Sequence, residues 1–155
     1  MNEIPKKYFI TKGIGESDTS QLNAFDRALM NAGIAQCNLV SVSSILPKKA
    51  KRISFQEIKP GAITFVVLSR VSGETGDEIS AGVGIAKTKN GAHNMIVETC
   101  GNGKAEEIRE KLRSSLNEMA DARGMVVDDA HYEMSTLKVR KKYGAALAAV
   151  VLLPK

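Results

Sequence analysis

The stretch AITFVVLSRVSGETGDEISAGVGIAK, residues 62–87, predicts two β-strands joined by a turn. Its first part, residues 62–71, is rich in β-branched residues, which favour strands over helices. The SGETGDE that follows contains glycines and acidic residues, a composition typical of a turn. Residues 78–87 then return to apolar and small side chains. The pattern indicates a protein built largely of β-sheet.

Further strands are predicted on both sides of this pair. They fall near residues 7–12, 37–43, 53–58, 93–99, 126–138 and 143–152. Strands outnumber helices by about eight to two, and their order is not a repeating strand–helix–strand unit. We therefore expect a single α+β domain, residues 1–155, with mainly antiparallel sheets and two helices covering their outer faces.

Two segments have the apolar spacing of an amphipathic helix. The first, residues 19–32, has its apolar positions at Leu22, Phe25, Leu29 and Ala32. Asp18, Thr19 or Ser20 can cap its start, and Gly33 suits its end. The second, residues 103–122, has an apolar stripe at Ala105, Ile108, Leu112, Leu116 and Met119, and Gly124 closes it.

Composition and length limit the class of protein. The chain has 155 residues, of which 43% are hydrophobic and 25% charged, as in ordinary soluble domains. No apolar run approaches the ~20 residues of a membrane span, and the start lacks the apolar core of a secretory signal. Cys37 and Cys100 are too few for a disulfide framework. A cytoplasmic protein without a membrane partner is expected.

The net charge of +5 raises the possibility of nucleic-acid binding. The basic residues cluster only at 48–52 and 138–142, and neither cluster is interleaved with aromatic side chains that stack on bases. Both clusters are better interpreted as solvated surface. We expect no nucleic-acid partner.

Conventional catalytic motifs are missing from the sequence. GNGK, residues 101–104, is not a phosphate-binding loop, because Glu98 and Ala105 stand where a glycine and a hydroxyl residue are needed. Gly82 and Gly84 lie inside a strand pattern and indicate close backbone packing. The two histidines have no partners at metal-ligand spacing, so no metal is expected. The protein is inert, a binding module, or obtains its reactive group in another way.

Two adjacent serines offer such a way. Residues 38–52, NLVSVSSILPKKAKR, begin as a strand and end as a solvated loop, and Ser43 and Ser44 lie at the junction. A serine hydroxyl can attack the carbonyl of the residue before it and convert that peptide bond into an ester. Elimination then breaks the chain and leaves a dehydroalanine, which hydrolyses to a pyruvoyl group. Asn38 can supply a donor for the oxyanion if the chain folds back. A strand that simply ends in two turn-forming hydroxyls is the other interpretation.

The surroundings of the two serines resemble the pyruvoyl-dependent arginine decarboxylase family. In residues 22–47 an N-A-F-D helix is followed by N-A-G-I and by an N-L-x-x-x-S-S-I-x-P strand end. The resemblance continues through GETGDEISAGVGIA at 73–86, MIVE at 95–98 and the EMxxxRG pattern at 118–124. It covers essentially the whole chain in order, and the Ser-Ser block is specific.

The resemblance implies a cleavage and a set of site residues. Cleavage between Ser43 and Ser44 would leave a β chain, residues 1–43, and an α chain, residues 44–155, headed by a pyruvoyl group made from Ser44. That group replaces pyridoxal phosphate, and no metal is involved. The residues matched to the family's site are Asn38 for cleavage, Glu98 as the active-site acid, Asp26 for the substrate guanidinium, and Leu29 for the substrate's methylenes. Leu22 can share the helix face of Asp26.

The family also implies an αββα sandwich and an assembly. Two sheets flanked by helices would associate as a homotrimer, or a multiple of it, with active sites between neighbouring subunits. The expected activity is that of a carbon–carbon lyase, which converts L-arginine to agmatine and CO₂ towards polyamines. Two alternatives stay open: a pyruvoyl decarboxylase for aspartate or histidine, and an uncleaved family member that serves as a structural or regulatory subunit.

Overall fold

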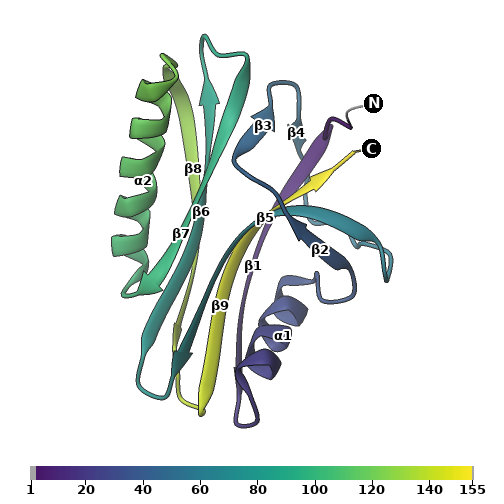
Figure 1. Cartoon of the computed structure of the whole chain (residues 1–155), viewed down its shortest axis with the longest axis vertical. Coiled ribbons are helices and arrows are strands. Elements are labelled where there is room, and N and C mark those ends of the chain that lie inside the picture. The colour runs from purple at the N-terminus through teal and green to yellow at the C-terminus, as the bar shows by residue number, and fades with distance from the viewer. Residues whose placement is uncertain (1–2, 155) are drawn as a thin grey trace.

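Two β-sheets pack face to face between two helices in the computed structural model, which describes residues 3–154 (Figure 1). The layers follow the order helix, sheet, sheet, helix, so the expected αββα sandwich is confirmed. The outermost positions of the expected domain, residues 1, 2 and 155, lie outside the described residues.

One sheet has five strands in the order β2-β5-β9-β1-β4. Their bounds are Lys7–Ser17 for β1, Asn38–Ser41 for β2, Lys51–Arg52 for β4, Ile63–Glu74 for β5 and Tyr143–Leu153 for β9. The central pairs, β5 with β9 and β9 with β1, are antiparallel, whereas the short strands β2 and β4 pair in parallel at the two edges. β2 is therefore an edge strand.

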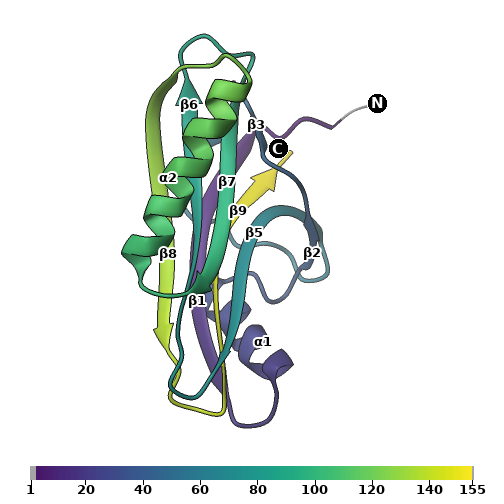
Figure 2. The same ribbon diagram turned by 60° about the vertical axis from the view of Figure 1, so that its left-hand side comes forward.

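The other sheet has four strands in the order β3-β7-β6-β8, all antiparallel. Their bounds are Ile45–Pro47 for β3, Glu78–Thr88 for β6, His93–Asn102 for β7 and Val127–Lys138 for β8. The predicted strand pair at 62–87 forms β5 and β6, but these two strands belong to different sheets. Their short turn thus forms a corner of the sandwich (Figure 2).

The space between the sheets is filled by apolar side chains from both inner faces. One buried cluster there consists of Tyr8, Leu46, Val67, Val83, Ile85, Ile96, Ala148, Val150 and Leu152. Because side chains alternate along a strand, membership of this cluster shows which face of each strand points inward. Ile96 of β7 and Val67 of β5 therefore identify the inner faces of the two strands that flank the serine pair.

Helix α1, Gln21–Ala32, covers the outer face of the five-stranded sheet. Ser20 caps its start by accepting a hydrogen bond from the Asn23 N–H, and Gly33 ends it in the left-handed conformation. The predicted apolar face is wrong in one respect, because Leu22 is 75% exposed. The helix instead buries Ala24, Ala28 and Ala32. Small side chains allow it to approach β1 closely, where a Cβ on Gly13 or Gly15 would collide with the helix backbone.

Helix α2, Ala105–Ala122, covers the four-stranded sheet through Ile108, Leu112, Leu116 and Ala120. A Cβ on Gly82 would come within 2.9 Å of Ile108 and Leu112. The prediction that this glycine serves close packing is therefore confirmed. The helix lies on the outer face of the sheet that carries β7, and so leaves the inner face of β7 free to form the site.

One predicted strand, residues 53–58, does not form. The Ile53 N–H bonds to the Tyr8 carbonyl, but no ladder continues beyond it. Its apolar side chains instead cover the core beside α1: Ile58 is buried there, and Phe55 packs edge-on against Phe9 with ring centroids 5.3 Å apart. The alternation of the segment reflects this packing and not a sheet.

Candidate active site

The Ser43–Ser44 connection passes from one sheet to the other. β2 ends at Ser41 on the edge of the five-stranded sheet, and β3 begins at Ile45 on the edge of the four-stranded sheet. On one side the Val42 N–H donates to the Val66 carbonyl at 2.9 Å, and on the other the Ile96 N–H donates to the Ser44 carbonyl at 2.7 Å. The peptide bond that is predicted to be cleaved therefore lies in a short segment that is hydrogen-bonded at both ends.

A hollow of about 460 Å³ opens beside Ser43. Its walls consist of Glu3, Pro5, Val42, Ser43, Ile45, Phe65 and Leu152. This volume is within the range of small-molecule sites in proteins, and mostly apolar walls with a few polar groups are typical of them. The hollow gives a small substrate access to the serine pair.

Glu98 lies on β7, two positions beyond Ile96 and on the same, inner face of the strand. Because Ile96 binds the Ser44 carbonyl, the carboxyl group of Glu98 lies along the strand in the direction of Ser43. Burial raises the pKa of this carboxyl above its ordinary value. Glu98 can thus stay protonated nearer neutral pH, as a proton donor must.

Asn38 is not next to the serine pair of its own chain. Residues 38–42 are extended along β5, and the Asn38 side-chain amide donates to the Gly61 carbonyl at 3.0 Å. An extended strand advances about 3.3 Å per residue, so Asn38 is on the order of 15 Å from Ser43. The chain does not fold back in the way that would bring this amide to the Ser43 carbonyl.

Asp26 is exposed on α1 and lies beside a different hollow, lined by Asn23, Asp26, Arg27, Met30 and Asn31. Leu22, four positions earlier, is also exposed, whereas Leu29 is partly buried against the core of the five-stranded sheet. Within one chain, Asp26 and Ser43 thus line two separate hollows.

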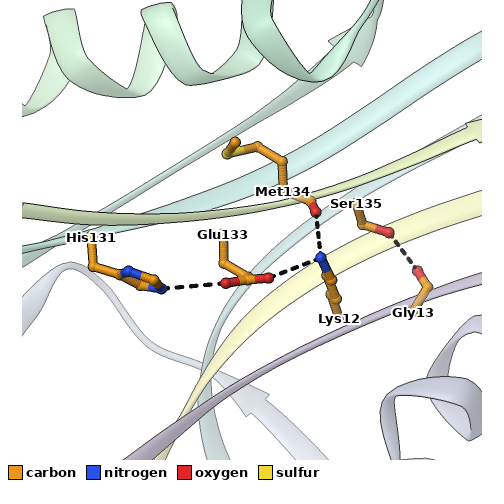
Figure 3. A network of polar contacts seen from close by, with 6 residues as sticks. All are labelled: Lys12, Gly13, His131, Glu133, Met134 and Ser135. Atoms are coloured by element: carbon orange, nitrogen blue, oxygen red, sulfur yellow. Dashed lines mark hydrogen bonds and ion pairs between the residues drawn. The ribbon is translucent and has the colours of Figure 1, made fainter.

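Sequence reasoning missed a polar network on the other side of the sandwich (Figure 3). Lys12 of β1 binds Glu133 of β8 at 2.9 Å and donates to the Met134 carbonyl at 3.3 Å, and His131 lies 3.3 Å from the other Glu133 oxygen. The Ser135 hydroxyl donates to the Gly13 carbonyl at 3.2 Å. No local pattern indicates these contacts, because β1 and β8 come from opposite ends of the chain.

Another contact that the sequence did not indicate anchors the loop after β3. The Lys48 ammonium group donates to the Thr88 carbonyl and, at 3.0 Å, to the Thr88 hydroxyl. Lys48 was interpreted as solvated surface because it lies in a basic cluster. Its ammonium group instead holds the chain that leaves the serine pair against the end of β6.

Two further searches concern metals and membranes. Within residues 3–154, no three His, Cys, Asp or Glu side chains gather as the ligands of a metal ion would. In the same part of the chain neither helix combines the length and apolar character needed to span a bilayer.

Fold and site together define a four-layer α+β protein in which a Ser-Ser segment is hydrogen-bonded to the strand that carries a glutamate of raised pKa. The family model for pyruvoyl-dependent arginine decarboxylases matches residues 7–155. Among curated proteins, one of this name from Methanothermobacter thermautotrophicus is 40% identical over 97% of this chain and 98% of its own length. Those from Methanopyrus kandleri and Thermococcus kodakarensis are 36% and 33% identical, with at least 96% of each chain covered.

The chain belongs to the pyruvoyl-dependent arginine decarboxylase family. This membership confirms the family and the enzyme class, a lyase, that the sequence motifs predicted. A family of this kind implies a covalent pyruvoyl group. The half-buried Ser44, with its carbonyl fixed on β7 and a hollow beside its neighbour, is compatible with such a group at that position.

Proposed function

We propose that this protein cleaves itself between Ser43 and Ser44 and then converts L-arginine to agmatine and CO₂. The observation that carries the proposal is the hydrogen bond from the Ile96 N–H to the Ser44 carbonyl, which aligns the serine pair with the strand that bears Glu98. The names of the relatives support the choice of substrate. The product would serve polyamine synthesis, in the cytoplasm.

In the cleavage step, the Ser44 hydroxyl attacks the carbonyl carbon of Ser43 and the acyl group moves from nitrogen to oxygen. Elimination then releases residues 1–43 with a carboxylate end, and loss of ammonia on hydrolysis leaves the pyruvoyl group on residues 44–155. The exposed position of Ser43 leaves its carbonyl accessible. Asn38 supplies an oxyanion donor from a neighbouring subunit, because the extended course of β2 separates it from the serine pair of its own chain.

During turnover, the pyruvoyl group supplies a carbonyl that takes up the substrate amine and draws electrons from the bond to CO₂. The Ile96 N–H holds the adjacent amide carbonyl and so orients the group. Glu98 donates the proton that replaces CO₂, and burial raises the pKa of its carboxyl, which favours the protonated form.

Asp26 binds the substrate guanidinium through two parallel hydrogen bonds, which a lysine ammonium cannot make. Leu22 and Leu29 contact the methylenes of the substrate. Because Asp26 and Ser43 line separate hollows of one chain, α1 of a neighbouring subunit completes each site.

Two exposed apolar surfaces suit such an assembly. The first lies around the serine pair on the edge formed by β2 and includes Val40, Val42, Ile45, Ile63 and Phe65. The second lies on α1, where Leu22 and Met30 are 75% and 63% exposed on either side of Asp26. A contact between two different surfaces of identical chains forms a ring when the rotation between neighbours closes, and we propose a ring of three, a homotrimer, or a multiple of it.

The substrate is tested with a panel of amino acids assayed for CO₂ release. Arginine is expected to turn over faster than lysine, aspartate or histidine. Asp26→Asn should weaken arginine binding by about 2–5 kcal/mol, mainly as a rise in KM. Faster turnover of aspartate or histidine would refute the choice of arginine. An intact mass that never changes would instead support an uncleaved, non-enzymatic subunit.

The shared site is tested by mixing subunits. Chains with Ser44→Ala keep Asp26 but cannot form the pyruvoyl group, and chains with Asp26→Asn have the opposite defect. If sites lie between subunits, co-assembled mixtures should recover activity that neither variant has alone. No recovery in a mixture shown by mass to contain both chains would refute the shared site.

A further inference from the structure

Ser69 is a fully buried hydroxyl in the interior between the sheets. It lies on β5, two positions from Val67, and therefore points into the space between the sheets. Its Oγ donates to the Thr99 carbonyl at 2.6 Å and accepts from the Gly82 N–H at 3.2 Å. One side chain thus links a strand of the five-stranded sheet to two strands of the four-stranded sheet.

The Thr99 carbonyl is adjacent to Glu98 and faces β6, because Thr99 is paired with Gly82 of that strand. β3 pairs with β7 only from Pro47 to Ile45, and the Ser44 carbonyl makes the next bond, to Ile96. Beyond Ile96, no strand of the described residues continues the ladder on this edge of β7. Ser69 lies on the opposite edge of β7, where its hydroxyl links the Thr99 carbonyl and the Gly82 N–H to β5.

The segment of β7 that carries Glu98 is therefore held from both edges of the strand. Ser44 holds it at Ile96, and Ser69 holds it at Thr99. The two bonds enclose three consecutive peptide units, with Glu98 among the residues between them. A shift of this segment would move the Glu98 carboxyl relative to Ser44, and displacements of about 1 Å at a catalytic group can cost on the order of a hundredfold in rate.

We propose that Ser69 is a positioning residue that fixes Glu98 against the Ser43–Ser44 connection. This inference rests on the proposed function, in which Glu98 donates the proton. Loss of the Ser69 hydroxyl would release this part of β7 from β5. The Glu98 carboxyl would then shift towards solvent, and its pKa would fall because less burial opposes its ionised form.

Two other titratable groups lie near this end of β7. Cys100 shares the strand face of Glu98, and burial, together with the Glu98 charge, raises the pKa of its thiol. Lys111 of α2 acts on Cys100 in the opposite direction. The variants described next retain both groups, so a change in Glu98 titration reports on the position of the strand.

The experiment compares Ser69→Ala with Ser80→Ala, a matched control. Ser80 is also fully buried, and its hydroxyl bonds to the Gly103 carbonyl at 2.7 Å and to the Thr136 hydroxyl at 2.9 Å. Each variant removes one buried hydroxyl with two hydrogen-bond partners, but only Ser69 touches the Glu98 segment. Similar losses of thermal stability are expected from both.

Ser69→Ala should lower kcat about tenfold to a hundredfold with little change in KM. The basic limb of its kcat–pH profile should move to lower pH, because a hydrated Glu98 loses its proton sooner. Ser80→Ala should keep the parent profile. Carbon-13 NMR titration of the Glu98 carboxyl in the cleaved enzyme should give a lower pKa in Ser69→Ala than in the parent or Ser80→Ala.

An unchanged Glu98 titration and kcat in Ser69→Ala would overturn the positioning role. The titration does not require activity, so it separates this failure from failure of the proposed function, which parent-like turnover by Glu98→Gln would reveal. If Ser69→Ala does not fold, Ser69→Cys provides the second variant. Its thiol nearly preserves volume but bonds weakly, and it should show the same directions at smaller size; parent-like values would refute the proposal.

Discussion

Two glutamates of the four-stranded sheet lie at the same level, one on each side of strand β6. Glu98 of β7 and Glu133 of β8 are both paired with Val83 of the intervening strand β6. Residues directly opposite one another share a face, so both carboxyl groups start from the inner face of the sheet. They lie on opposite sides of β6 and so reach different sides of the sandwich.

The pKa values of these two carboxyls move in opposite directions. Burial raises the pKa of Glu98. Burial would also raise the pKa of Glu133, but the hydrogen bond and charge of Lys12, with a smaller contribution from His131, lower it below the ordinary value. Glu98 therefore keeps its proton to a higher pH than an ordinary glutamate and Glu133 loses its proton at a lower pH, because in the described part of the chain only Glu133 has a cation beside it.

The two glutamates lie on sides of the sandwich where the sheets are connected in different ways. On the β8 side, Lys12 and Ser135 connect the edge of one sheet to the edge of the other (Figure 3). On the β7 side, the sheets are connected by the Ser43–Ser44 segment, and the neighbouring glutamate has no ion-pair partner within residues 3–154. The same residue type thus has an ion-pair partner on one side and, among the described residues, none on the side where we propose the reaction.

The largest effect is expected from the serine that distinguishes the β7 side. Ser44→Ala removes the attacking hydroxyl, so the chain should stay whole and release no CO₂ from arginine. Ser43→Ala is the matched control, because it keeps the carbonyl under attack and should still be cleaved. Intact mass and reaction with a hydrazide reagent measure the outcome. Cleavage of Ser44→Ala would disprove the assigned bond.

A second prediction compares the two glutamates in turnover. Glu98→Gln should be cleaved normally but lose about 10²–10⁴-fold in kcat, because an amide cannot donate the proton that replaces CO₂. Glu133→Gln changes the same atoms on the other side and should retain kcat within about threefold. Steady-state kinetics on cleaved protein measures both. Equal losses of kcat in the two variants would show that Glu98 has no catalytic role that Glu133 lacks.

A third prediction concerns acid stability on the β8 side. Because the folded pKa of Glu133 is lowered, its ionised form stabilises the fold above the unfolded value near 4.3, and this contribution disappears as the pH falls through the folded pKa. Between pH 6 and pH 3, Glu133→Gln should therefore lose about 0.5–1 kcal/mol less stability than the parent, as suits a partly exposed ion pair.

Urea unfolding at the two pH values measures this difference. Lys12→Met removes the partner instead of the acid and should give the same reduced pH dependence. A parent-like dependence in both variants would mean that the Lys12–Glu133 pair does not contribute to stability.

The smallest effect is expected from Glu98 on the β7 side, whose pKa is shifted in the direction opposite to that of Glu133. A raised folded pKa means that the native state holds a proton that the unfolded chain has lost, so stability falls as the pH rises above about 4.5. Glu98→Gln removes this cost and should be more stable than the parent at pH 7, by less than about 0.5 kcal/mol because the group is partly exposed. If urea unfolding shows that the variant is less stable than the parent at pH 7, the pKa of Glu98 is not raised in the folded state.

The sequence predicted many elements because their signals are local. The caps at Ser20 and Gly33, the apolar stripe of α2 and the β-branched run of β5 depend on residues within a few positions of one another. Residues 53–58 have the same alternation as a strand but no sheet edge to pair with. Their prediction failed because alternation reports which side chains are buried, and not what buries them.

By itself, the sequence determined the family, and its contiguous motifs predicted the serine pair and Glu98 as site residues. Only the tertiary structure decided that Ile96 binds the Ser44 carbonyl, that Ser69 lies against Thr99 and that Lys12 meets Glu133. Each of these contacts depends on the register between strands far apart in the chain. Register is set by how whole sheets pack, because a shift of one residue would turn every side chain to the other face.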